Sequence, residues 1–398
     1  MYTLLHEKRF ENNNKFRKSS FTRNRKLNFV NLIVLLAHPM LKSVQRELDD
    51  FFQKLNGDEF QLRSITKGAL TQARAQLKYQ AFIELDQPTQ DEFYENGGAY
   101  GWDKYRVLAV DGSTIKLPFH SSIVEEFGVN SFGPNADSPQ SMARISLLYD
   151  PLNCITVDAQ IGGYSTSEAS LCYEHLSKVK EDDLLVFDRY YASGNLMWSI
   201  KNKNADFLFR MKDNWWNVVD EFQKEKAKDK IIILETDYGS IKVRLIKSGN
   251  RVFCTSVLNK KIKPSDFNDL YDNRWGVEEA YKTLKNWCEI ETFSGKTALA
   301  IKQDFYSKIF LMNLSAAFTH PVEEQIKKEK ENYKVNRVQA LASISQLPIA
   351  LFLKKTGSKA IKAFDNIVSK TIDIIRKGRR NPRKIRPKKK HSMSYKKI

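Results

Sequence analysis

Two aspartates stand where a protein could hold a divalent cation. Asp111 directly follows the apolar run at 105–110, and Asp188 directly follows the apolar run at 184–187. A carboxylate at the end of a buried strand is fixed by the sheet while its head reaches the cleft where open α/β sheets bind ligands. Hard divalent cations prefer such oxygen ligands. A single Asp-Gly pair is common turn chemistry, but two strand-end aspartates favour a cation site.

A third acidic residue lies in a helical segment with a regular stripe of polar side chains. Offsets of three, four and seven residues place four side chains on one helical face: Tyr271, Arg274, Glu278 and Lys285. One carboxylate then stands between two cations and a phenol. This arrangement suits a metal ligand flanked by phosphate-binding groups, with Arg as a bidentate fork and Lys as a point charge. Alone, the stripe would fit a solvated face held by ion pairs between successive turns equally well.

Together these segments closely resemble the DDE transposases of the insertion-sequence-four family, over roughly residues 100–315. The Tyr-Arg-Glu-Lys signature of that family is matched at every spacing. The resemblance implies a catalytic carboxylate triad of Asp111, Asp188 and Glu278. It further implies that the triad holds two Mg²⁺ ions, which Mn²⁺ can replace. By the same resemblance, the DNA-contacting partners in the signature are Tyr271, Arg274 and Lys285.

The chain departs from the family pattern at one place next to the triad. The family usually follows its second Asp with Arg-Gly-Tyr, whereas Asp188 is followed by Arg189, Tyr190 and Tyr191. A tyrosine restricts the backbone more than a glycine does. Asp188 is therefore the catalytic assignment that depends most on the local backbone.

The resemblance implies a DNA transposase that cleaves strands with metal ions and transfers them to target DNA by a cut-and-paste type of mechanism. Its partners would be terminal inverted repeats, target DNA and a second copy of the chain, and it would be a bacterial cytoplasmic, nucleoid-associated protein. Two alternatives stay open. One is a non-catalytic DNA-binding protein derived from such an element, and the other is an RNase H-like nuclease or resolvase acting on structured nucleic acid.

The elements that must position the triad follow an α/β pattern. Apolar runs predict strands at 105–110, 143–149, 154–161, 184–187 and 207–211. Helical patterns between the later runs predict a mixed sheet flanked by helices, which agrees with the RNase H-like core of the family. An antiparallel β insertion is expected at 215–263. A long helix is then expected to start near Ser265 and to continue past Leu284.

Helical periodicity dominates both sides of this core. In the N-terminal part, Thr66 is a plausible N-cap for a helix whose exposed faces carry amide and basic side chains. Such a helix could lie in a major groove and contact DNA through Arg74 and Lys78, although an ordinary amphipathic helix fits as well. A polar linker is expected from Gln87 to Gly101. Residues 300–375 are expected to form helices broken near 319–321.

These patterns divide the chain into four expected regions. They are a helical N-terminal DNA-binding region at 1–100, a catalytic domain at 101–315, a helical C-terminal region at 316–375 and a basic tail at 376–398. The net charge of +18 is concentrated at the ends, because the tail holds twelve Lys and Arg and no acid. Such a tail cannot bury apolar surface and favours a polyanionic partner.

Other classes of function are disfavoured. Four widely spaced cysteines without a Cys-x-x-Cys pair indicate reduced thiols rather than a zinc site. The apolar stretch 29–41 is too short to span a bilayer. Gly295-Lys296-Thr297 resembles the end of a phosphate-binding loop, but position 290 is Ile rather than Gly, so no nucleotide is expected.

Overall fold

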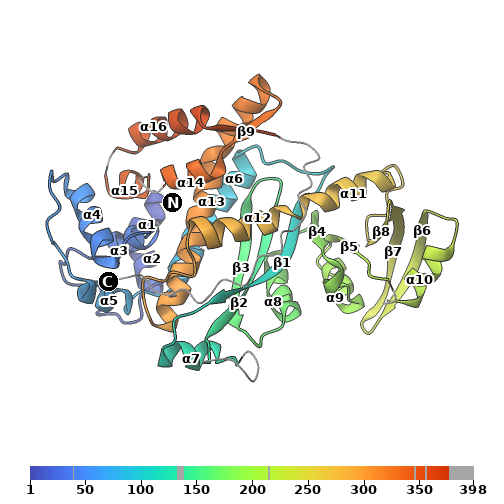
Figure 1. The fold of residues 1–398 in the computed structure, drawn as a ribbon, viewed down its shortest axis with the longest axis horizontal. Coiled ribbons are helices and arrows are strands. Elements are labelled where there is room, and N and C mark those ends of the chain that lie inside the picture. Colours follow the sequence, from blue (N-terminus) through green and yellow to red (C-terminus); the bar gives the residue numbers. More distant parts are fainter. Residues whose placement is uncertain (39, 132–138, 214–215, 345–346, 355, 376–398) are drawn as a thin grey trace. The chain divides into compact units, whose positions relative to one another are not determined.

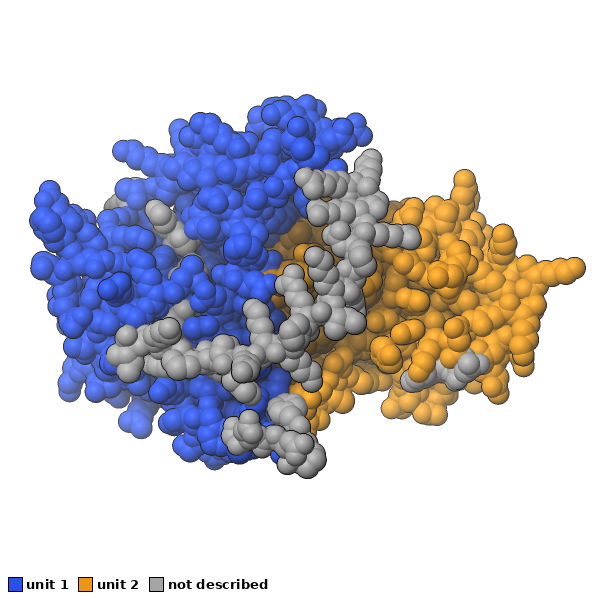
Figure 2. Space-filling view, viewed as in Figure 1, with its two compact units in different colours: residues 1–98, 115–142, 283–398 blue, residues 99–114, 143–282 orange. Residues whose placement is uncertain are grey.

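A computed structural model describes residues 1–38, 40–131, 139–213, 216–344, 347–354 and 356–375 (Figure 1). The chain divides into two compact units, coloured separately in Figure 2. Unit 1 contains residues 1–98, 115–142 and 283–398, and unit 2 contains residues 99–114 and 143–282. The four regions expected from the sequence do not map one to one onto these units, because helices from both ends of the chain belong to unit 1.

Unit 2 is built on a mixed sheet. Its strands are β1 (Arg106–Lys116, whose last two residues belong to unit 1), β2 (Met142–Asp150), β3 (Ile155–Gly163), β4 (Asp183–Phe187), β5 (Asp206–Arg210), β6 (Asp229–Thr236), β7 (Gly239–Ser248) and β8 (Arg251–Thr255). Its helices are α8 (Glu168–His175), η1 (Leu176–Lys178), η2 (Arg189–Tyr191), α9 (Gly194–Lys201), α10 (Asn217–Lys224), α11 (Pro264–Asn273) and α12 (Gly276–Lys282).

The strand order is β3-β2-β1-β4-β5-β8-β7-β6. β4 pairs parallel with both β1 and β5, whereas β2 and β3 form an antiparallel pair. Parallel strands in the middle of a sheet are covered on both faces, which is why β1, β4 and β5 read as continuous apolar runs. This mixed sheet flanked by helices confirms the predicted RNase H-like fold class.

The predicted β insertion joins this same sheet. β8 pairs antiparallel with β5, and β7 and β6 follow outward from it. β6, β7 and β8 all lie within the range expected for the insertion, and the turn between β7 and β8 has Gly249 at a φ of 60°. The insertion therefore lengthens the sheet by three strands instead of forming a separate layer.

Unit 1 is mainly helical. Its N-terminal helices are α1 (Tyr2–His6), α2 (Lys8–Asn13), α3 (Phe29–Leu36), α4 (Val44–Asn56), α5 (Lys67–Arg74) and α6 (Gln80–Asn96), followed by α7 (Ser121–Phe127). Its later elements are η3 (Thr283–Trp287), α13 (Ala298–Glu329), β9 (Tyr333–Val335), α14 (Arg337–Ile344), α15 (Leu347–Phe352), α16 (Gly357–Lys370) and β10 (Ile372–Ile374). α6 and α13 pack against each other and join the two ends of the chain.

Three expectations about where helices begin and end were wrong. The expected linker from 87 is helical to Asn96, because α6 buries Leu85 and Phe93. The expected break near 319–321 is absent, since α13 continues through Pro321 with a largely buried surface. The expected long helix from 265 is instead divided between α11 and α12 at Arg274 and Trp275.

The structure also bears on the cysteines and on the absence of a predicted membrane span. All four cysteines are free thiols. Among the described helices, none has the length and apolar character needed to cross a membrane. The basic tail at 376–398 lies outside the described residues.

Candidate active site

The register of the two central parallel strands places the two aspartates together. Val110 of β1 pairs with Phe187 of β4. Asp111 and Asp188 are the next residues after this pair and lie at the same level of the sheet. Neighbouring strands lie about 4.8 Å apart. Asp188 directly follows the end of β4, and both carboxyl groups are partly accessible. The prediction that Asp111 also ends its strand was wrong, because β1 continues past Asp111 to Lys116.

The helix α12 brings the third carboxylate to the same edge. The Tyr281 hydroxyl donates a hydrogen bond of 2.6 Å to the carbonyl oxygen of Asp111. Glu278 lies one turn earlier on the same face of α12. A Cβ atom at Gly276 would lie 2.8 Å from the Cβ of Pro151, so only glycine lets the helix start this close to the turn after β2.

Arg274 links the three members of the triad electrostatically. Its side chain is only 4% exposed, and Nη2 lies 3.5 Å from Oε1 of Glu278. Burial alone would lower the pKa of Arg274, but Tyr271, the two aspartates and Glu278 outweigh burial and raise it. The guanidinium therefore stays protonated and partly neutralises all three carboxylates.

The negative charge at the site is nevertheless incompletely balanced. Burial raises the pKa of Asp111 to about 6, the Arg274 guanidinium and the Gly112 amide oppose this, and the carboxylates of Glu278 and Glu168 add to it. A carboxyl with a raised pKa beside like charges is a group that a bound cation would stabilise. In charge and in oxygen donors, the residues present fit divalent cations.

The side chains do not form a finished metal site as they stand. Within the described ranges, no three His, Cys, Asp or Glu side chains are grouped closely enough to hold a metal ion. The carboxylate of Glu278 is instead paired with the Arg274 guanidinium. The structure thus brings the predicted ligands to one edge of the sheet, with a guanidinium among them.

The other two signature residues, Tyr271 and Lys285, belong to different units. Tyr271 lies in α11 and is buried in the core, with its ring 5.3 Å from that of Phe253 and 5.6 Å from the Arg274 guanidinium. This position supports Arg274 rather than exposing the phenol to DNA. Lys285 lies in η3, which belongs to unit 1, and its partial burial lowers the pKa of its amine.

The departure at Tyr190 is accommodated without backbone strain. Asp188 caps the short helix η2, and its carboxylate accepts a 2.5 Å hydrogen bond from the amide of Arg189. Tyr190 lies inside η2 and is not among the described residues with positive φ. This position therefore does not require the conformational freedom of glycine.

A fourth carboxylate, which the sequence did not reveal, lies beside Asp111. Glu168 begins α8, and a Cβ on Gly112 would lie 2.7 Å from its Cγ and Cδ. Glycine at 112 therefore lets this carboxylate cover the backbone next to Asp111. Oε1 of Glu168 accepts a 2.7 Å bond from Arg144, and its side chain remains 40% exposed. No motif links residues this far apart in sequence.

Replacing Glu168 by Gln should raise the Mg²⁺ concentration needed for half-maximal cleavage. The substitution keeps the shape of the side chain and removes one negative charge, worth about 1 kcal/mol or roughly fivefold at a partly exposed site. Metal titrations of strand cleavage would measure the change. Glu174→Gln, on an exposed position of the same helix, is the matched control. Identical titrations for both variants would show that Glu168 has no role in the site.

A buried chain of hydrogen bonds holds the backbone of Asp111 from the other side. Nδ1 of His175 lies 2.7 Å from Oδ2 of Asp158, and Nε2 lies 2.9 Å from Oγ of Ser146. Ser146 in turn donates a 3.3 Å bond to the carbonyl oxygen of Asp111. In the sequence, no metal-ligand spacing surrounds His175. The structure gives it a supporting position instead.

Arg74 and Lys78, the other two predicted DNA-binding residues, lie in unit 1. The helix α5 begins after Thr66, whose side chain caps it as expected. Arg74, however, is 4% exposed and donates to Gln303, Ser294, Ala300 and Asp304, so four of its five N–H donors are used inside the protein. This placement corrects the expectation for Arg74. Lys78 is partly exposed and donates to the carbonyl of Asn13.

Comparisons with known proteins identified a relative, a solved structure and a family to which this chain is similar. The chain is similar to the Escherichia coli K12 protein named "Putative transposase InsZ", with 23% identity over 184 residues, which are 45% of this chain and 61% of that protein. The match thus spans about three fifths of the length of that relative. A solved structure, the piggyBac transposase synaptic complex with hairpin DNA, is similar with a TM-score of 0.45 and 11% identity, covering 92% of this chain and 84% of that one. Residues 102–314, more than half of the chain, match the family described as the transposase DDE domain, and the chain belongs to that family.

Proposed function

We propose that this chain is a DNA transposase of the insertion-sequence-four type, with Asp111, Asp188 and Glu278 as its catalytic residues. The observation that carries this proposal is the pairing of Val110 with Phe187, which aligns the two aspartates at one edge of the sheet. The Tyr281 contact to Asp111 adds Glu278 to the same edge. Membership of the transposase DDE domain family supports the reaction class.

The triad would hold two Mg²⁺ ions, which when bound activate the attacking water or 3′-hydroxyl and stabilise the leaving oxygen of an in-line displacement. The protein supplies the positions. The sheet fixes the backbone of the two aspartates, and the Asp158–His175–Ser146 chain restrains that of Asp111. Arg274, held protonated, would neutralise a phosphate that enters beside the carboxylates.

The substrates that follow from this proposal are terminal inverted repeats and target DNA. Cleavage would leave free 3′-hydroxyl ends, which are then joined to the target in a cut-and-paste reaction. No side chain needs to form a covalent bond to DNA, because water and then the 3′-hydroxyl are the nucleophiles. A homodimer would hold the two ends of the element together.

Strand cleavage should depend entirely on a divalent cation. We expect the purified protein to nick duplex DNA carrying the terminal repeats of its element in Mg²⁺ or Mn²⁺, and EDTA to abolish cleavage while leaving binding measurable. Denaturing gels of end-labelled DNA would show the 3′-hydroxyl product. Cleavage that continues at full rate with EDTA would exclude the proposed chemistry. Binding of the repeats without any cleavage would favour the non-catalytic alternative, and cleavage of branched DNA without preference for the repeats would favour a resolvase.

A further inference from the structure

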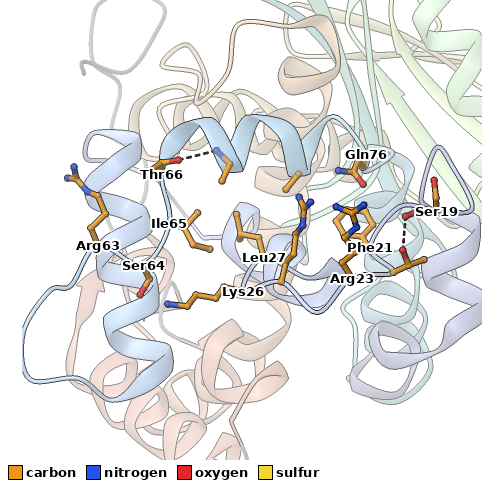
Figure 3. Close-up of a pocket in the computed structure, with 14 residues that line it drawn as sticks. Ser19, Phe21, Arg23, Lys26, Leu27, Arg63, Ser64, Ile65, Thr66 and Gln76 are labelled. Carbon is orange, nitrogen blue, oxygen red and sulfur yellow. Dashed lines mark hydrogen bonds between the residues drawn. The ribbon is translucent and has the colours of Figure 1, made fainter.

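We infer that a basic pocket in unit 1 binds the backbone phosphates of duplex DNA, at a site distinct from the carboxylate triad of unit 2. The pocket has a volume of about 700 Å³ and lies between α5, the residues preceding it and the segment 19–27 (Figure 3). Its charged lining residues are Arg23, Arg25, Lys26 and Arg63, and none of the described residues that line it is acidic. We call it the basic pocket.

The cations of this region are available to a ligand. Six Lys and Arg and no acid occur in the twelve residues from Lys15 to Lys26. All but Lys15 are exposed, and within the described residues only Lys15 among them makes an ion pair, with Glu11. Arg63 lies 3.5 Å from Asp49 and keeps 65% of its side chain exposed. In Figure 3 the labelled cations extend along the pocket from Arg63 at one end to Arg23 at the other, with Lys26 between them.

The fold holds this segment in place despite its charge. The ring of Phe21 packs edge-on against Phe29, 5.5 Å away, and Leu27 is buried. The amide of Phe16 donates a 3.1 Å bond to Gln76, just after α5. The cations are therefore carried by an anchored backbone along α5 rather than by a free tail. Preformed cations lose less conformational entropy on binding than disordered ones do.

Duplex DNA fits this surface better than a small phosphate compound does. A mononucleotide needs two or three cations, whereas the row of exposed cations continues beyond the pocket to Arg17 and Lys18. Hydroxyl groups of Ser19, Thr22, Ser64 and Thr66 also line the pocket, and such groups commonly contact phosphate oxygens and fix the register of a protein on DNA. Each phosphate contact releases counterions, so binding here should be strongly salt-dependent. The inference rests on the proposed function in taking DNA as the ligand, but it does not require catalysis.

The test compares DNA affinity of full-length variants without metal, by fluorescence anisotropy of labelled duplex at several salt concentrations. The triple variant Arg23→Gln/Arg25→Gln/Lys26→Gln should bind about tenfold to a hundredfold more weakly, and the slope of log K against log salt should fall by about 2 to 3. The control Lys359→Gln/Lys362→Gln/Lys370→Gln removes the same charge from exposed positions of α16. It should change affinity and slope much less.

Arg63→Gln, a single change on the opposite side of the pocket, covers the case in which the triple variant fails to fold, and it should lower the slope by about 1. Equal losses in the pocket and α16 variants, or no loss in the pocket variants, would overturn the inference. The inference would also be overturned if inorganic phosphate or a mononucleotide bound in the pocket without any effect on the affinity for duplex DNA. If the wild-type protein binds DNA through the pocket but never cleaves it, the inference stands and the proposed function fails.

Discussion

Replacing Asp111 by Asn should reduce metal-dependent strand cleavage at least about a thousandfold, while DNA affinity stays close to that of the wild type. The substitution keeps the volume of the side chain and removes a negatively charged oxygen ligand. Loss of such a ligand removes several kcal/mol of transition-state charge stabilisation, and each 1.36 kcal/mol is a factor of ten in rate. Single-turnover cleavage of end-labelled DNA would measure the rate, and anisotropy would measure binding.

The same result is expected for Asn at Asp188 and for Gln at Glu278, because the three residues act on the same phosphate. Glu181→Gln is a suitable control, since Glu181 is an exposed carboxylate of unit 2 shortly before β4. The melting temperature of each variant would show that the fold is retained. A triad variant that cleaves as fast as the Glu181 control would remove that residue from the site.

Replacing Arg74 by Met should destabilise unit 1 by about 3–5 kcal/mol without weakening DNA binding by the folded protein. Arg74 donates 2.8 Å bonds to both Gln303 and Asp304, and Asp304 is itself only 5% exposed. Burial alone would raise the pKa of Asp304, but Arg74, Lys308 and the bonds from Ser294 outweigh burial and lower it. Without Arg74, the buried carboxylate of Asp304 would lose its nearest positive charge and one hydrogen bond. Urea unfolding would measure the loss.

A double-mutant cycle separates the ion pair from simple packing. Arg74→Met/Asp304→Asn should be more stable than the sum of the two single changes predicts, because the second change removes the charge that the first leaves uncompensated. DNA affinity measured at temperatures where the variant is folded is the second readout. A stable Arg74→Met variant with weaker DNA binding would instead support the original expectation that Arg74 contacts DNA.

Local patterns in the sequence determined the framework of the site. The apolar runs before Asp111 and Asp188 predicted two buried strands, because fully buried parallel strands have no polar alternation. Only Asp188 follows the end of its strand, since β1 continues to Lys116. The N-cap at Thr66 and the three strands of the β insertion followed equally local rules. The spacing of the signature correctly grouped Arg274 with Glu278, although the turn at Arg274 and Trp275 separates α11 from α12.

Tertiary contacts decided which of these side chains face solvent and which support the site. Arg74 was indistinguishable in sequence from a DNA-contacting arginine, but its hydrogen-bond partners lie 220 to 230 residues away. Glu168 lies beside Asp111 only because α8 packs against Gly112. Periodicity specifies one face of an element and not the partner that covers it, so burial, charge pairing and the fourth carboxylate emerged only when distant segments packed together.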